Sequence, residues 1–108
     1  YSLIKINFVC YNVFSMKYIL KGQVFGRVQK VGFRAFTKDI ADSLGIQGYV
    51  KNLEDGSVEF EAIGEKELLE AFLEKLKEGP KHAFVSDIKY KMEVFEDEDY
   101  PKSFDILY

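Results

Sequence analysis

The chain has 108 residues, of which 47% are hydrophobic and 31% are charged. A chain of this length buries one hydrophobic core, which excludes two domains. Its 15 basic and 18 acidic residues give a net charge of −3, which argues against the strongly basic surface of a nucleic-acid-binding protein. With Cys10 as the single cysteine and His82 as the single histidine, the chain forms no intramolecular disulfide and no Cys/His metal cluster.

Residues 1–15 differ from the rest of the chain, because Lys5 is their only charged residue and their apolar residues show no helical period. A transmembrane helix needs about 20 apolar residues, and a secretory signal needs a basic start and a small-residue cleavage site. The segment has neither pattern, so we expect a cytoplasmic protein. We expect residues 1–15 to be an N-terminal extension outside the domain, with an extra strand as the alternative, and residues 16–108 to form the domain.

The first predicted elements are a strand and a helix. Residues 18–25 are rich in apolar and aromatic side chains and lead into Gly26, which is typical of a central strand. The period then changes, because apolar residues recur at helical spacing from Phe33 to Leu44, and Gly45 follows as a stop. We therefore expect an amphipathic helix over residues 33–44.

A hairpin and a second helix follow. Residues 47–52 and 57–62 are predicted to pair through a turn at residues 53–56. The inward side chains are expected to be Val58, Phe60 and Ala62, and the outward ones Glu59 and Glu61. Residues 65–78 then carry a leucine-rich helical stripe, with acidic residues at the start, lysines at the end, and Gly79-Pro80 as a stop.

The last elements complete the fold class. Residues 88–94 alternate apolar and charged side chains, which predicts a strand with one buried face, and the acidic residues 96–99 predict a turn. Residues 103–108 can add a short C-terminal strand. The order predicts an α+β, ferredoxin-like βαββαβ sandwich, in which an antiparallel sheet carries two helices on one face. Because many functions share this fold, the order alone does not define an activity.

Two motifs carry the functional information. Residues 26–34 read Gly-Arg-Val-Gln-Lys-Val-Gly-Phe-Arg and join the first strand to the first helix. Backbone N–H groups in such a loop converge on an anion, and an arginine adds a planar fork of donors that suits phosphate. Taken alone, this loop is better explained as an ordinary strand-to-helix connection with a solvated Arg34. The second motif, Gly-Tyr-Val-Lys-Asn followed by Asp55-Gly-Ser-Val, places Asn52 at the end of a strand.

Together the two motifs resemble the acylphosphatase family, whose signatures read Gly-Arg-Val-Gln-Gly-Val-Gly-Phe-Arg and Gly-x-Val-x-Asn, followed by Asp-Gly-Ser-Val. The resemblance covers residues 16–108. It implies a metal-independent hydrolase that cleaves the carboxyl–phosphate bond of acyl phosphates and releases inorganic phosphate, with no cofactor. It implies that Arg34 binds the phosphate and that Asn52 orients the attacking water. The phosphate-binding loop that it implies is Val28, Gln29, Lys30, Val31, Gly32 and Phe33.

The chemistry suits these residue types. An acyl phosphate already has a good leaving group, so catalysis can rest on positioning and on stabilising charge at the phosphoryl oxygens, without a protein base. Lys30 departs from the family signature, which has glycine at this position. If its φ is positive, the lysine costs on the order of 1 kcal/mol, whereas a negative φ costs little. Its side chain is expected to face solvent, with added charge near the anion as the alternative.

Three other functions stay open at this stage. A non-catalytic RNA-recognition sheet would need stacking aromatic residues and a basic face, but Phe60 lies between Glu59 and Glu61. The chain could also be a domain of a larger carbamoyl-processing protein, or a family member that has lost catalysis. The expected partners are a small-molecule acyl phosphate and its phosphate product, with no nucleic acid and no membrane, and the expected state is a monomer.

Overall fold

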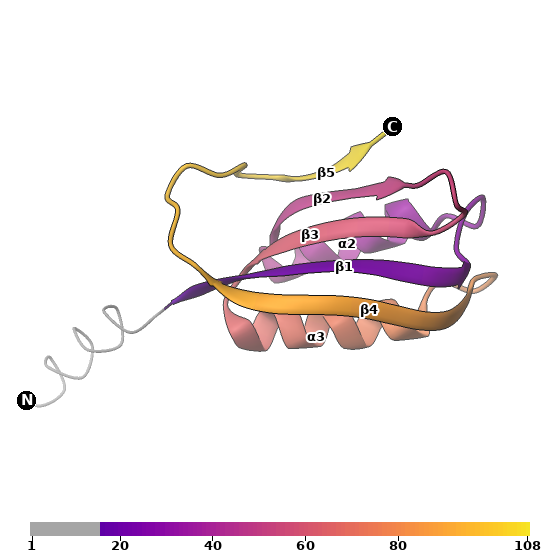
Figure 1. Cartoon of the computed structure of the whole chain (residues 1–108), viewed down its shortest axis with the longest axis horizontal. Helices are drawn as coiled ribbons and strands as arrows, with labels where there is room; N and C mark the ends of the chain where they lie inside the picture. The colour runs from indigo at the N-terminus through magenta and orange to yellow at the C-terminus, as the bar shows by residue number, and fades with distance from the viewer. Residues whose placement is uncertain (1–15) are drawn as a thin grey trace, which may run out of the picture.

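The computed structural model describes residues 16–108 of the chain (Figure 1). The expected N-terminal extension, residues 1–15, lies outside the described residues. The elements, in chain order, are β1 (Lys17–Arg27), α2 (Phe33–Leu44), β2 (Gln47–Asn52), β3 (Val58–Gly64), α3 (Lys66–Glu78), β4 (Phe84–Phe95) and β5 (Phe104–Leu107).

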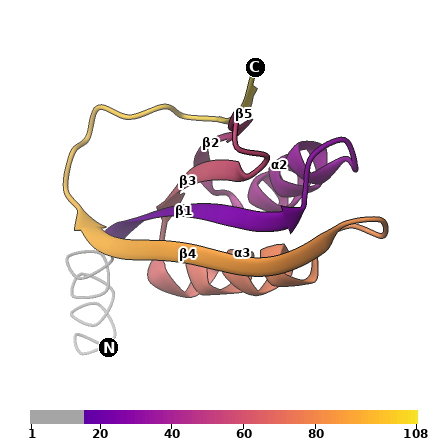
Figure 2. The ribbon, with the colours of Figure 1, turned by 45° about the vertical axis from the view of Figure 1, so that its right-hand side comes forward.

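The five strands form one sheet in the order β4-β1-β3-β2-β5. β1 pairs antiparallel with β3 and β4, and β2 pairs antiparallel with β3. The predicted ferredoxin-like sandwich is confirmed, with α2 and α3 on the same face of the sheet (Figure 2). The sheet is mixed rather than wholly antiparallel, because β5 runs beside β2 in the same direction.

The core lies between the helices and the sheet. Val58, Phe60 and Ala62 of β3 are buried as predicted, and Glu59 and Glu61 lie on the opposite face. The Phe72 ring of α3 packs edge-to-face against Phe60 and Phe104, with centroids 5.7 and 6.0 Å apart. These aromatic contacts join α3 to β3 in the middle of the sheet and to β5 at its edge.

The predicted buried face of the last long strand is only partly realised. Ile88 and Met92 of β4 are half-buried and pack against the core. Tyr90 and Val94 occupy the same face by alternation, but they are 53% and 45% exposed. β4 is an edge strand with one neighbour, so part of this face extends beyond the packed interior.

Candidate active site

The topology brings the two sequence motifs to one end of the sheet. β1 and β2 are both antiparallel to β3, which lies between them, so they run in the same direction. The C-terminal ends of β1 and β2 therefore lie at the same end of the sheet, at the right of Figure 1. The loop from β1 to α2 begins there, and Asn52 is the last residue of β2.

A pocket of about 170 Å³ lies between these segments. Its lining residues are Val28, Lys30, Gly32, Phe33, Arg34, Ala35, Asn52, Ile106 and Tyr108. The structure thus brings Arg34 and Asn52, the two residues predicted to be catalytic, into one cavity. A larger hollow of about 570 Å³ lies near Met16 and Phe95, but none of its lining residues belongs to either motif.

The predicted phosphate-binding residues differ in where they lie. Val28 and Phe33 are buried in the core and line the pocket together with the exposed residues Lys30 and Gly32. Val31 packs against the core, and Gln29 is half-buried and bonds to the β2–β3 turn. Neither Gln29 nor Val31 is among the pocket-lining residues. Phosphate binding by the loop stays a prediction.

The loop enters α2 through two residues with positive φ. Lys30 has φ 64° and Gly32 has φ 77°. Gly32 immediately precedes α2, and its carbonyl oxygen accepts a bond from the Phe36 N–H at 3.0 Å. No side chain of the described residues caps this end of the helix, so the first N–H groups of α2 remain available beside the pocket. Because the φ of Lys30 is positive, the backbone strain expected for a lysine in this conformation is present.

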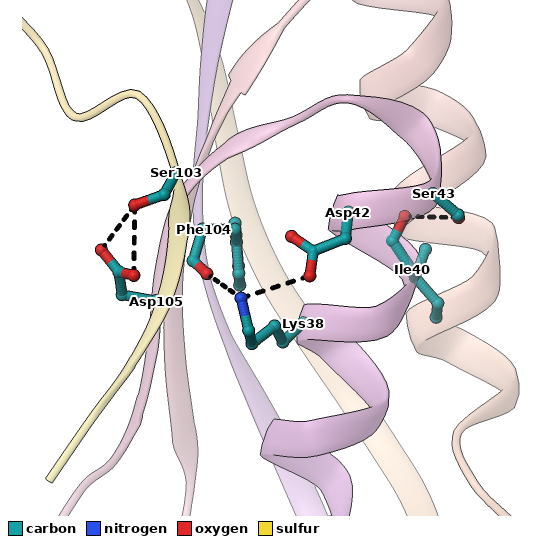
Figure 3. Close-up of polar contacts among 7 residues, drawn as sticks. All are labelled: Lys38, Ile40, Asp42, Ser43, Ser103, Phe104 and Asp105. Carbon is teal, nitrogen blue, oxygen red and sulfur yellow. Dashed lines mark hydrogen bonds and ion pairs between the residues drawn. The ribbon is translucent and has the colours of Figure 1, made fainter.

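Arg34 is held by the C-terminal end of the chain. Its Nη1 donates to the Leu107 carbonyl oxygen at 3.3 Å, and its guanidinium carbon lies 4.7 Å from the centroid of the Tyr108 ring. One turn further along α2, Lys38 Nζ donates to the Phe104 carbonyl oxygen at 2.7 Å and pairs with Asp42 at 3.2 Å (Figure 3). Two cations of one helix face thus fix β5 against α2.

Ile106 and Tyr108 are pocket residues that the sequence analysis missed. They reach the pocket because β5 pairs with β2 in parallel, with Ile106 opposite Val50. The sequence predicts a short last strand but does not specify its neighbour. No local motif marks these two residues, so only knowledge of the sheet order could have placed them in the site.

Asn52 has an unusual environment. Its Oδ1 is the one buried side-chain nitrogen or oxygen of residues 16–108 that has no hydrogen-bond partner. An unsatisfied buried acceptor costs about 1–3 kcal/mol, so native proteins usually pair such atoms with protein, water or ligand. Because Asn52 lines the pocket, the side chain that carries this unpaired oxygen lies beside any molecule bound there.

The pocket is cationic. Arg34 and Lys30 are its charged side chains, and the lining contains no aspartate, glutamate or histidine. Nearby, Ser57 donates from its hydroxyl and its backbone N–H to the carboxylate of Asp55, which lowers the pKa of that carboxyl. Within residues 16–108, no group of three His, Cys, Asp or Glu residues is arranged to hold a metal ion. The two cationic side chains of the pocket can therefore attract a small anion.

Comparison with known proteins assigns the family. Residues 20–106 match the acylphosphatase family model. An acylphosphatase of Archaeoglobus fulgidus is 48% identical over 85 residues, which cover 79% of this chain and 92% of the relative. This chain belongs to the acylphosphatase family.

Solved structures give the same assignment. The crystal structure of acylphosphatase from Bacillus subtilis superposes with a TM-score of 0.79 and 36% identity, over 84% of this chain and 99% of that one. A structure of full-length HypF in its phosphate- and nucleotide-bound form matches with a TM-score of 0.68 and 29% identity. That match covers 85% of this chain and 12% of the HypF chain, so the fold also occurs as part of a larger protein.

The strain at Lys30 gives a stability prediction. We expect Lys30→Gly to raise the free energy of unfolding by about 0.5–1 kcal/mol, because glycine adopts φ 64° without the Cβ clash. Lys30→Met is the matched control, since it removes the charge but keeps the Cβ, and it should bring no such gain. Urea unfolding of the three proteins measures the difference, and equal stabilisation by both variants would show that charge, not φ, is responsible.

Proposed function

We propose that this protein hydrolyses acyl phosphates to a carboxylate and inorganic phosphate, with the phosphoryl group held by the loop 28–33 and Arg34, and the water oriented by Asn52. Family membership and the 48% identity to a named acylphosphatase support the reaction. One observation carries the assignment of residues: Arg34 lines the same small pocket as Asn52, whose buried Oδ1 has no hydrogen-bond partner.

The residues divide the chemistry between them. The guanidinium of Arg34 offers paired N–H donors to two phosphoryl oxygens, and the N-terminal N–H groups of α2 favour negative charge beside it. Asn52 Oδ1 accepts a hydrogen bond from the water, and this bond directs a lone pair of the water oxygen at phosphorus. The water oxygen bonds to phosphorus, the bond from phosphorus to the acyl oxygen breaks, and the carboxylate leaves with the electron pair.

The proton of the water has a simple destination. The pocket lining offers no carboxylate and no imidazole that could act as a base. In our proposal the phosphoryl oxygens accept the proton, so that an acyl phosphate dianion and water give a carboxylate and monoanionic phosphate. Positioning and charge stabilisation then supply the catalysis. A family member that has lost catalysis is the alternative, and turnover separates the two.

Within residues 16–108, no helix is both long enough and apolar enough to span a membrane. A small-molecule acyl phosphate and its phosphate product are the proposed ligands, and a cytoplasmic monomer is the proposed form. The composition and the two motifs of the chain support these proposals.

The direct test of the reaction is phosphate release from acetyl phosphate, measured with and without a chelator. We expect turnover that the chelator does not reduce, because Arg34 and the helix N-terminus supply the positive charge. Absence of turnover would favour a non-catalytic family member, and loss of turnover on chelation would contradict a metal-independent mechanism.

Arg34→Ala should lower kcat/KM by about 10²–10³-fold, because it removes charge-assisted donors at the phosphoryl group. The inhibition constant for inorganic phosphate should rise in the same variant. Arg27→Ala is the matched control: it removes the same charge from an exposed position in the same motif, outside the pocket lining. Near-normal phosphate inhibition in Arg34→Ala would remove Arg34 from its proposed role.

Asn52→Ala should lower kcat by about 10²-fold while the inhibition constant for phosphate changes little, because the water loses its acceptor and the phosphate contacts remain. The thermal midpoint should not fall, since Oδ1 makes no hydrogen bond within the protein. If Asn52 served instead to form the turn, the variant would show a lower midpoint with unchanged kcat.

A further inference from the structure

The side chain of Gln29 links the two halves of the site. Gln29 lies in the loop between Val28 and Lys30, both of which line the pocket. Its Nε2 donates to the carbonyl oxygens of Leu53 and Ser57, each at 2.8 Å. A primary amide carries two N–H donors, so both bonds can form at once. The loop is thereby joined to the segment that follows Asn52.

The two acceptors are the ends of one closed turn. The Leu53 N–H donates to the Ser57 carbonyl at 2.9 Å, and the Gly56 N–H donates to the Leu53 carbonyl at 3.2 Å. Ser57 also donates to the carboxylate of Asp55 from its backbone and its hydroxyl. The two bonds from Gln29 therefore hold the backbone at both ends of this turn.

The β2–β3 turn sets the position of Asn52. Leu53 follows Asn52 directly, so a displacement of the Leu53 carbonyl rotates the backbone that carries the Asn52 side chain. The Oδ1 of Asn52 has no bond of its own to hold it. The direction of this oxygen therefore depends on the backbone. That backbone is held at Asn52 by strand pairing with Val58, and at Leu53 by the bond from Gln29.

We propose that Gln29 is a positioning residue, whose amide holds Asn52 at a set place relative to Arg34 by tying the phosphate-binding loop to the β2–β3 turn. The proposal rests on the role given to Asn52 under the proposed function. The side-chain amide of Gln29 bonds to the turn and Gln29 is not among the pocket-lining residues, so this amide acts through Asn52 rather than on the substrate.

A neighbouring glutamine provides the comparison. Gln23 of β1 also donates to this turn, to the Ser57 hydroxyl at 2.7 Å and to the Asp55 carboxylate at 3.3 Å. It holds the side chains of the turn rather than the carbonyls at its ends. Loss of the Gln23 amide should therefore weaken the fold without redirecting Asn52.

The test is a double-mutant cycle on the full chain with acetyl phosphate, comparing the unmodified protein, Gln29→Met, Asn52→Ala and the double variant. Gln29→Met should lower kcat by about tenfold or more, since small misplacements of a catalytic group cost up to about 10²-fold. The inhibition constant for inorganic phosphate should change far less than kcat. In the Asn52→Ala background, Gln29→Met should have almost no further effect on kcat.

Gln23→Met is the control and should lower the thermal midpoint with kcat retained. If Gln29→Met does not fold, Gln29→Asn gives the same comparison, because the shorter amide cannot reach both carbonyls. Effects of Gln29 and Asn52 that multiply in the double variant would overturn the proposal, and so would a lower midpoint with unchanged kcat in Gln29→Met. Retention of kcat in Asn52→Ala alone would instead overturn the role given to Asn52.

Discussion

The register of β3 between β1 and β2 is the constraint on which the site depends. Val58, at the start of β3, lies opposite Val24 of β1 on one side and opposite Asn52 of β2 on the other. Val58 and Val24 are fully buried, so hydrophobic burial fixes this register. A slip of one residue in β2 would turn Asn52 to the opposite face of the sheet, away from the pocket. Core packing thus determines where a polar side chain meets the β1–α2 loop.

The site contains three local departures from good packing and backbone geometry. Lys30 has a positive φ, Asn52 Oδ1 has no partner, and α2 begins without a side-chain cap among the described residues. Each feature costs stability, and the residues concerned, Lys30, Asn52 and Gly32 at the start of α2, all line the pocket. Such departures are expected at a ligand-binding site. The apolar core elsewhere in the domain can offset their cost in stability.

The sequence predicted the local structure better than the long-range contacts. Helix α2 begins and ends at the predicted residues, because Gly32 and Gly45 both have positive φ at its ends. The hairpin and the inward side chains of β3 were also predicted from period-two alternation. The exposure of Tyr90 and Val94 was not, since the pattern of one strand does not reveal that it lies at the sheet edge.

The candidate site was likewise predicted only where a local motif marks it. Arg34 and Asn52 belong to two recognisable segments, and the structure places both in one pocket. Ile106 and Tyr108 reach that pocket through the parallel pairing of β5 with β2, which depends on contacts distant in sequence. The φ of Lys30 was also undetermined, because a non-glycine residue adopts a positive φ only where the surrounding loop imposes it.

The open face of the sheet bears on the alternative of a nucleic-acid-binding module. Glu59 and Glu61 of the central strand β3 lie on this face, within 2.9 and 3.1 Å of the Tyr49 hydroxyl. Burial and these carboxylates raise the pKa of Tyr49 well above its usual range, so its hydroxyl stays protonated and can donate to them. Glu59 also pairs with Lys51 at 3.7 Å and Lys21 lies opposite Glu61, so this face carries charges of both signs, and Tyr49 is engaged with its carboxylates. The cationic pocket at the sheet end is therefore the better anion site.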